Sequence, residues 1–394
     1  MKSPNISKMK SGALLFALII PFMARAQDST SVTFYGVVDT AIEYVNNIPQ
    51  YQNGVETGKH SSVHFTNLTS SVPSRWGLRG REDLGNGLSA VFNLESGFNT
   101  GTGTSGQGGR LFGRQAWVGL KGDWGQLAFG RQNSMLLYSL VRADIMGPSA
   151  HGLAAFDTFI PNARIDNAIT YRANFNGFKF GAAYSRGRNS VAGVTPAAAN
   201  CGVDYGDQSA CSSWSAMMGY DTANWGVAAG YDTMRGNNPV VNYEGLAAGE
   251  NDTHWTVNGY VKFDALKIGL LYMNHKTDAA QGLNKTAPFN SGRSLGDRSD
   301  MWQLGASYRL SPAVTLDGTV NYLRYNNATE SSNAWYYVAR ATYSLSKRTA
   351  VYVSAAYMKN KGLSANSAAS GTALVLAQQG GNQTAVMTGL RHSF

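Results

Sequence analysis

Strict alternation of apolar and polar residues is the dominant feature of this sequence. In residues 335–345 every second residue is apolar, and the residues between them are more polar. Because successive side chains of a strand point to opposite faces, a period of two predicts strands with one apolar face. The same pattern begins at Trp255 and at Trp302. No apolar run after Met23 approaches the roughly 18 residues that indicate a membrane-spanning helix, so the chain is predicted to be all-β.

The links between these segments alternate between short and long. Tight turns are expected at 264–265 and 311–313, whereas the links at about 187–212 and 277–298 are long and rich in Gly, Asn, Ser and Asp. Short turns on one side and long loops on the other are typical of a transmembrane antiparallel β-barrel. An even strand number brings both termini to one side, and sixteen strands leave a lumen wide enough for water. The sixteen predicted strands are 32–44, 72–82, 87–99, 110–121, 125–133, 164–174, 178–186, 213–221, 225–234, 253–263, 267–276, 299–310, 314–325, 334–345, 349–359 and 384–394.

The N-terminus has the pattern of an export signal. Three lysines precede an apolar run at 13–23, and residues 24–26 form a small-x-small cleavage site. The run is shorter than the about 20 residues that a spanning helix needs, which favours a secretory signal. An N-terminal core helix is the alternative. We therefore predict a signal peptide at 1–26 and a single barrel domain at 27–394.

Charge and motif content argue against nucleic-acid binding and catalysis. Residues 1–26 hold four basic and no acidic residues, so their removal lowers the formal net charge from +9 to +5. The remaining basic residues are scattered, whereas nucleic-acid binders cluster them. The six histidines, at 60, 64, 151, 254, 275 and 392, fall in no hydrolase or metal-binding motif. No enzyme, metal or cofactor is predicted; the alternative is a hydrolytic barrel whose site is assembled across strands.

The two cysteines, Cys201 and Cys211, lie in one Gly/Ser/Asp-rich link. Export leads to an oxidising compartment, where disulfides form and persist. We expect a Cys201–Cys211 disulfide that staples this link without being needed for the barrel; two free thiols are the alternative. The spacing and the lack of a nearby histidine argue against a metal site.

Several motifs, taken in their order and spacing, resemble one family, the Gram-negative general diffusion porins of the β-proteobacterial branch. The resemblance implies a 16-stranded barrel in the cell outer membrane, usually a homotrimer, surrounded by outer-membrane lipid and lipopolysaccharide. It also implies that Phe394 belongs to the terminal signal read by the barrel-assembly machinery. The motifs lie at 32–39 (VTFYGVVD), 74–88 (SRWGLRGREDLGNGL), 113–120 (GRQAWVGL), 127–132 (LAFGRQ) and 387–394 (MTGLRHSF).

In this family the third outer loop folds inward and narrows the pore. The matching loop here is about 133–162, and it is rich in apolar residues, which suits a loop packed on the inner wall. A partner-facing patch is the alternative. The resemblance implies that acids on this loop face arginines on the wall. Asp144 matches the family position, Asp157 is a weaker candidate, and no second acid lies near Pro148.

Parity along the strands selects the arginines of the wall. Trp76 and Leu78 are assigned to the lipid face, so the arginines of the second strand face the lumen; on the sixth strand the same argument turns Asp166 inward with two arginines. Arg131 shares parity with Leu127 and Phe129, which predicts that it points outward at a rim or a subunit interface. The inward arginines are Arg75, Arg79, Arg81, Arg164 and Arg172, and Arg114 is added because it matches the family.

These features predict a water-filled channel for passive diffusion of small hydrophilic solutes and ions. Opposed charges across a narrow aperture set up a transverse field, and the aperture sets the size limit. The excess of arginines over loop acids predicts a weak preference for anions at low salt. A substrate-specific uptake channel and a surface adhesin on the same barrel are the alternatives, and saturable block of single-channel current would reveal the first.

Overall fold

The computed structural model describes residues 30–394, except 54, 67, 148, 157–163, 189–208, 237–245, 281, 284–292 and 370–376. The predicted signal peptide at 1–26 therefore lies outside the described residues, and so do Asp157 and Cys201. No helix among the described residues is long and apolar enough to cross a membrane.

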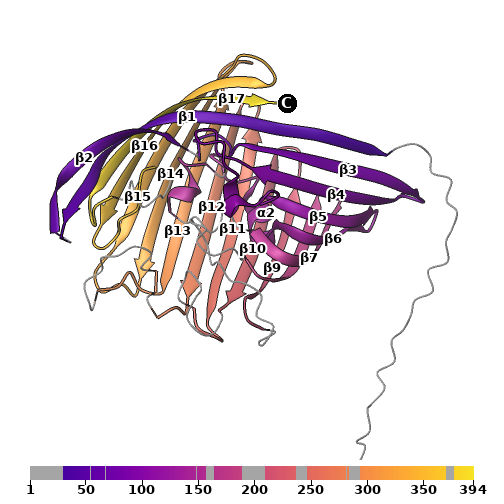
Figure 1. The fold of residues 1–394 in the computed structure, drawn as a ribbon, viewed down its shortest axis with the longest axis horizontal. Coiled ribbons are helices and arrows are strands. Elements are labelled where there is room, and N and C mark those ends of the chain that lie inside the picture. The colour runs from indigo at the N-terminus through magenta and orange to yellow at the C-terminus, as the bar shows by residue number, and fades with distance from the viewer. Residues whose placement is uncertain are drawn as a thin grey trace, which may run out of the picture.

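Antiparallel strands form one closed barrel (Figure 1). Neighbours along the chain pair with each other, except β2 and β3, which both pair with β1. The first strand closes the barrel on the last through pairs that run from Val37↔Ser393 to Val45↔Ala385. The strands are β1 (Ser31–Gln52), β2 (Val55–Thr66), β3 (Arg75–Gly85), β4 (Leu88–Gly97), β5 (Gln115–Gly122), β6 (Gly125–Asn133), β7 (Arg164–Phe175), β8 (Phe178–Arg186), β9 (Ser212–Asp221), β10 (Trp225–Arg235), β11 (Asn251–Phe263), β12 (Leu266–Thr277), β13 (Arg298–Arg309), β14 (Val314–Asn326), β15 (Asn333–Ser344), β16 (Thr349–Lys361) and β17 (Asn382–Ser393).

The seventeen strand segments make a sixteen-stranded wall, because β2 and β3 follow one another along the same edge of β1. β1 pairs with β3 from Ser31 to Val37 and with β2 from Ala41 to Gln52. Between them the described residues 68–74, here called the β2–β3 break, leave the ladder. The Ser74 side chain bridges the gap: its hydroxyl accepts from the Asp39 N–H at 2.9 Å and donates to the Asp39 carbonyl at 2.8 Å.

The two faces of the wall differ as the alternation predicts. On β13, Leu304 is 55% exposed while its neighbour Gln303 is 1% exposed. Aromatic side chains form a belt on the exposed face, where Trp255, Tyr272, Trp302, Tyr322 and Trp335 make successive ring contacts. Such a girdle lies at the headgroup level of a membrane. The exposed apolar face is thus the lipid-facing surface, and the buried face lines the interior.

One strand segment was not predicted from the sequence. β2 and the second half of β1 run out together as a hairpin beside the barrel, at the left of Figure 1. The predicted first strand ended at 44 and the second began at 72, whereas the ladder continues to Gln52 and resumes at Val55. The reason is that β2 mixes Glu56, Lys59 and His60 among few apolar residues, so it lacks a clear apolar face.

The C-terminal residue extends the closing pair of strands. The N–H and carbonyl of Phe394 each bond to Gly36 at 3.1 Å, and its ring lies 5.4 Å from that of Phe34. Phe394, Leu390 and Val386 are exposed on one face, which is the parity predicted from the sequence. Its recognition by the assembly machinery stays a prediction.

Cys211 is fully buried and disulfide-bonded. It lies just before β9, where its N–H and carbonyl bond to Gly236 and Gly187. Because Cys201 lies outside the described residues, the Cys201–Cys211 pairing stays a prediction.

Candidate pore constriction

Residues 134–156, here called the β6–β7 segment, pack against the buried face of the wall. Ser134 caps the short helix α2 (Met135–Leu140) by accepting the Leu137 N–H at 3.4 Å, and the Met135 N–H donates to the Ser215 hydroxyl on β9 at 2.9 Å. The helix contacts β8, β9, β10 and β11. In Figure 1 it lies within the outline of the barrel, beside these strands.

Glycines in the strands make room for this segment. A Cβ atom at Gly181 on β8 would lie 2.5 Å from the Met135 sulfur, and one at Gly305 on β13 would lie 2.7 Å from Ile145. Gly230 on β10 and Gly269 on β12 would clash with Ser139 and with the backbone of Ala143 in the same way. Four wall positions without side chains therefore form the seat of the segment, and these glycines were not singled out from the sequence.

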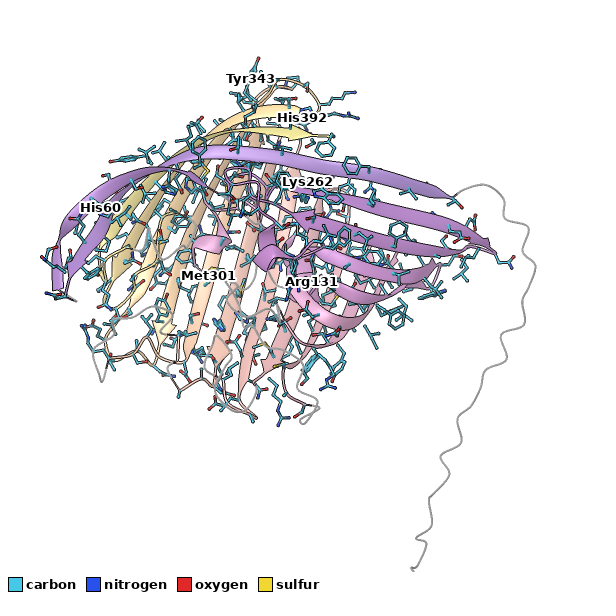
Figure 2. All side chains as sticks on the ribbon, viewed as in Figure 1. His60, Arg131, Lys262, Met301, Tyr343 and His392 are labelled. Atoms are coloured by element: carbon cyan, nitrogen blue, oxygen red, sulfur yellow. The ribbon has the colours of Figure 1, made fainter. Side chains whose placement is uncertain are left out.

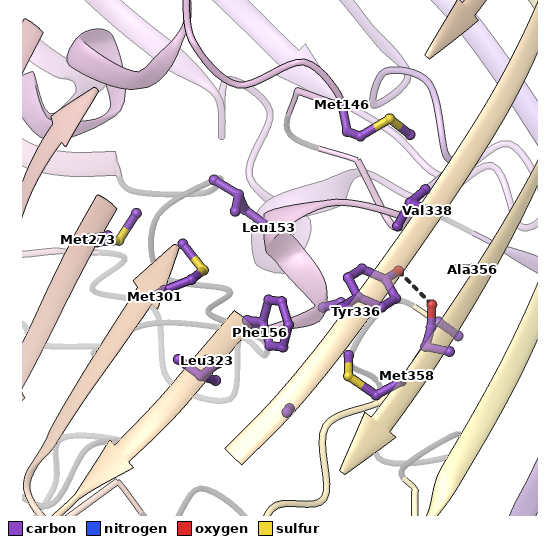
Figure 3. Packing of buried hydrophobic residues seen from close by; sticks show 14 of the residues in the cluster. Met146, Leu153, Phe156, Met273, Met301, Leu323, Tyr336, Val338, Ala356 and Met358 are labelled. Carbon is purple, nitrogen blue, oxygen red and sulfur yellow. Dashed lines mark hydrogen bonds between the residues drawn. The ribbon is translucent and has the colours of Figure 1, made fainter. Parts of the chain in front are cut away.

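The end of the segment packs into an apolar cluster on the opposite strands. Met146, Leu153 and Phe156 lie among Met301, Leu323 and other side chains of β12–β16 (Figure 3). The Phe156 ring meets the Tyr336 ring edge-on at 5.4 Å, and the Tyr336 hydroxyl donates to the Ala368 carbonyl at 2.8 Å.

A buried histidine connects the segment to β1 and β16, the two strands that flank β17. His151 Nε2 lies 2.9 Å from Glu43 Oε1 on β1, and its Nδ1 lies 2.8 Å from the Ser354 hydroxyl on β16. His64 on β2 lies 3.3 Å from the other oxygen of Glu43. Residue spacing gave no indication of this cluster, because its members lie 108 and 203 positions apart from His151.

The predicted basic wall is brought together in part. Arg114 Nε lies 2.6 Å from Glu95 Oε1, and Arg75 Nε lies 3.5 Å from the other oxygen of the same carboxylate. The buried Arg164 lies within electrostatic reach of Arg75 and Arg114. Five of the inward arginines were predicted to form the constriction, without Arg172, which lies nearer the rim. Three of these five therefore surround one acid, Glu95, which was not predicted as a site residue.

The other two predicted arginines lie elsewhere on β3. At a rise of about 3.4 Å per residue, Arg79 and Arg81 lie about 14 and 20 Å along the strand from Arg75. Both are exposed. Arg79 lies over the Tyr35 ring at 5.3 Å, and Arg81 donates to Ser89 at 3.0 Å. They line the end of the barrel with the short turns and do not join the cluster.

Arg131, which was predicted to point outward at a rim or a subunit interface, lies near the end of β6 and is largely buried. It pairs with Asp166 and donates to the Gly113 carbonyl at 2.8 Å. Figure 2 labels Arg131 on the ribbon. Gly130 has a φ of +121°, and the register of β6 against β7 shifts between Gly130 and Gln132. The register runs from Gly130↔Ala168 to Gln132↔Ile165, so the extra residue of this bulge lies on β7. Strand β6 keeps its alternation, because Ala128 and Gln132 are buried while Phe129 is exposed. Arg131 therefore keeps the parity of Phe129, and its outward orientation stays a prediction, while Asp166 compensates its charge within the chain.

A second ion pair extends the basic cluster. Arg110 Nη2 lies 3.5 Å from Asp166 Oδ2, so that Asp166 joins two arginines. We use the name arginine cluster for Arg75, Arg110, Arg114, Arg131 and Arg164, which share the two carboxylates Glu95 and Asp166. These five arginines and two carboxylates carry an excess of three positive charges.

The loop acid Asp144 lies inside the barrel, near β13 and away from the arginine cluster. It is beside the side chain of Gln303 on β13, the backbone of Met146 and Gly147, and the charge of Arg340. Burial raises the pKa of the Asp144 carboxyl to about 7, and these polar neighbours offset the effect only in part. Asp144 and the arginine cluster therefore occupy different sectors of the interior.

We expect the ionisation of Asp144 to be measurable as a pH-dependent current. Below its pKa the carboxyl group is protonated and neutral, so anion preference should rise as the pH falls from 8.5 to 5.5, with a midpoint near pH 7. Reversal potentials in a salt gradient measure this change. In Asp144→Asn the step near pH 7 should be absent, and an equal step in that variant would contradict the assignment.

A closed barrel with an exposed apolar belt and a charged interior defines an outer-membrane channel, and comparison with known proteins gives the family. A family model for Gram-negative porins matches residues 13–363. An outer membrane porin protein of Bordetella pertussis is 31% identical over 418 residues, covering 98% of this chain and 100% of the relative. Outer membrane porin protein 32 of Delftia acidovorans is 28% identical over 97% of this chain and 99% of its own length.

A solved structure has the same architecture. The anion-selective porin from Comamonas acidovorans superposes with a TM-score of 0.69 at 25% identity, covering 93% of this chain and all of that chain. This chain belongs to the Gram-negative porin family, and it is a protein of the Gram-negative outer membrane. Its relatives are channel proteins and not enzymes.

Proposed function

We propose that this protein is a general diffusion porin with a weak preference for anions, set by the arginine cluster beside the inward-folded β6–β7 segment. The observation that carries the proposal is the imbalance within the cluster, where five arginines share Glu95 and Asp166. Two of these arginines, Arg131 and Arg164, are largely buried. Charges between low-dielectric walls focus the field and raise the local concentration of counter-ions.

The same arrangement supports the aperture. The β6–β7 segment fills the space over the wall glycines and meets the β2–β3 break, where the Ala150 N–H donates to the Thr69 carbonyl at 2.8 Å. Water and small hydrophilic solutes would pass between this segment and the arginine cluster. A solved neighbour at 25% identity is described as anion-selective, which agrees with the sign of the proposed preference.

Reversal potentials of the wild-type protein test the proposal. In a gradient of potassium chloride around 0.1 M we expect a potential of the sign that marks anion preference. The preference should fade towards 1 M, because the Debye length falls from about 10 Å to about 3 Å. A clear cation preference at 0.1 M would contradict the proposed sign, and a preference independent of salt would contradict its electrostatic origin.

We also propose a homotrimer in the outer membrane, in contact with lipid and lipopolysaccharide. The early strands present large apolar side chains outward, among them Val32, Phe34, Val118 and Phe129. Light scattering in mild detergent, corrected for bound detergent, should give three times the protomer mass. A single protomer mass under these conditions would count against the assembly.

A further inference from the structure

Two histidines and two aspartates that no motif links lie together on the interior wall, away from the arginine cluster. Asp252 and His254 are two residues apart on β11, and His275 lies directly opposite His254 on β12. Asp232 on β10 is opposite His254 on the other side. All four side chains are buried. The group lies where β11 begins and β12 ends, at the end of the barrel with the long links.

We infer that Asp252, His254 and His275 form a binding site for a divalent transition-metal ion of the Zn²⁺ type, with Asp232 as the fourth ligand. The Asp252 carboxylate meets both imidazoles, since Oδ1 lies 3.2 Å from His254 Nδ1 and Oδ2 lies 2.8 Å from His275 Nε2. Ligand atoms of a tetrahedral zinc site lie about 3.3 Å apart. The candidate ligand atoms of these three residues lie within 4.8 Å of one another.

The strand register explains why the ligands converge. Residues two apart on a strand point to the same face, and directly opposite residues on neighbouring strands have Cβ atoms about 5 Å apart. The two imidazole rings stack at 3.8 Å with 17° between their planes, so they leave the wall in the same direction. A small tilt of each ring directs a nitrogen at a common centre beside Asp252.

The charge of the group favours a cation. Asp232 Oδ1 accepts from Arg188 at 2.5 Å, whereas its Oδ2 is buried with no hydrogen-bond partner among the described residues. Among the residues that the structure describes, the two aspartates and Arg188 sum to one negative charge when both imidazoles are neutral. A buried uncompensated charge is costly, and a divalent cation would compensate it. Imidazole nitrogen with carboxylate oxygen suits Zn²⁺ and its neighbours, whereas Ca²⁺ and Mg²⁺ prefer oxygen ligands alone.

Binding of zinc chloride to the full-length mature protein tests the inference. Folded protein in detergent, stripped with a chelator and dialysed, should bind one Zn²⁺ per protomer in calorimetry at pH 7.5. His254→Ala and His275→Ala should each weaken binding by at least about tenfold, as loss of groups that support metal ions commonly does. His60→Ala is the matched control, because His60 is exposed on β2, and its binding should equal that of the wild type.

Two further measurements separate metal loss from misfolding. His275→Gln keeps a polar side chain of similar size, and its heat-modifiable migration on gels should match the wild type while Zn²⁺ binding is lost. Co²⁺ in the wild type should give the visible absorption of a tetrahedral site, and this absorption should be absent in His275→Gln. Wild-type protein that takes up no stoichiometric zinc, or equal binding in folded His275→Gln, would overturn the inference. The readouts do not depend on ion selectivity, so they stand apart from the proposed function.

Discussion

Replacing Arg75 or Arg164 with alanine should shift the selectivity of the channel towards cations. Each substitution removes one charge from a cluster with an excess of three. An ion that passes about 7 Å from a unit charge in water interacts with it by about 0.6 kcal/mol, and screening at 0.1 M salt reduces this energy to about 0.3 kcal/mol. Because the energy has opposite signs for anions and cations, the ratio of anion to cation permeability should fall about two- to threefold. Reversal potentials at 0.1 M potassium chloride give this ratio directly.

Matched variants separate a local effect from a general loss of charge. Arg81→Ala removes the same charge from an exposed position about 20 Å along β3 from Arg75, so its effect should be smaller. Arg172→Ala should also do less, because Arg172 lies nearer the end with the short turns, opposite Gln126. Glu95→Gln should raise anion preference, since it removes a negative charge from the cluster. Equal effects of Arg75→Ala and Arg81→Ala would contradict the site assignment.

Replacing His151 with alanine should loosen the end of the β6–β7 segment and increase both the conductance and the current noise of single channels. The substitution removes the contacts with Glu43 and Ser354 and leaves a buried carboxylate with a poorer partner. Each buried polar group left without its partner costs about 1–3 kcal/mol, which is enough to populate displaced conformations of the segment.

Three variants define the origin of that effect. Ser354→Ala removes one contact and should give a smaller increase in noise than His151→Ala. His151→Gln can donate to Glu43, so its current noise should be lower than that of His151→Ala. His60→Ala should have no effect, because His60 is exposed on the outer hairpin. Single-channel traces of His151→Ala that cannot be distinguished from wild type would show that the apolar contacts of Phe156 hold the segment without the histidine.

The wall of the barrel could be predicted from the sequence because its information is local. Each strand must turn one face to lipid, so apolar residues recur at every second position within short segments such as 302–310. Where the ladder departs from a regular strand, the same rule fails. At β2 a hairpin without a clear apolar face left no pattern to detect.

The interior could be predicted only in part, because it is assembled from distant residues. Arg75, Arg114 and Arg164 were selected by parity or by family resemblance, and the structure brings them together. Glu95 and His151 were missed because their roles depend on which strands become neighbours and on where a loop docks. Glycine within a strand can mark a close approach of other backbone or side chains. Gly230 is such a position, but the sequence alone does not show which segment approaches it.

The glycine seat has a consequence for the order in which the molecule forms. The β6–β7 segment rests on Gly181, Gly230, Gly269 and Gly305, and it is fastened to Glu43 and Ser354 at the seam where the chain's two ends meet. Contacts between residues so far apart in sequence form slowly, because the chain must close large loops before they are made. The segment can therefore dock only on a wall that is already curved and nearly closed. The segment that narrows the channel therefore docks last, after the strands around it have paired.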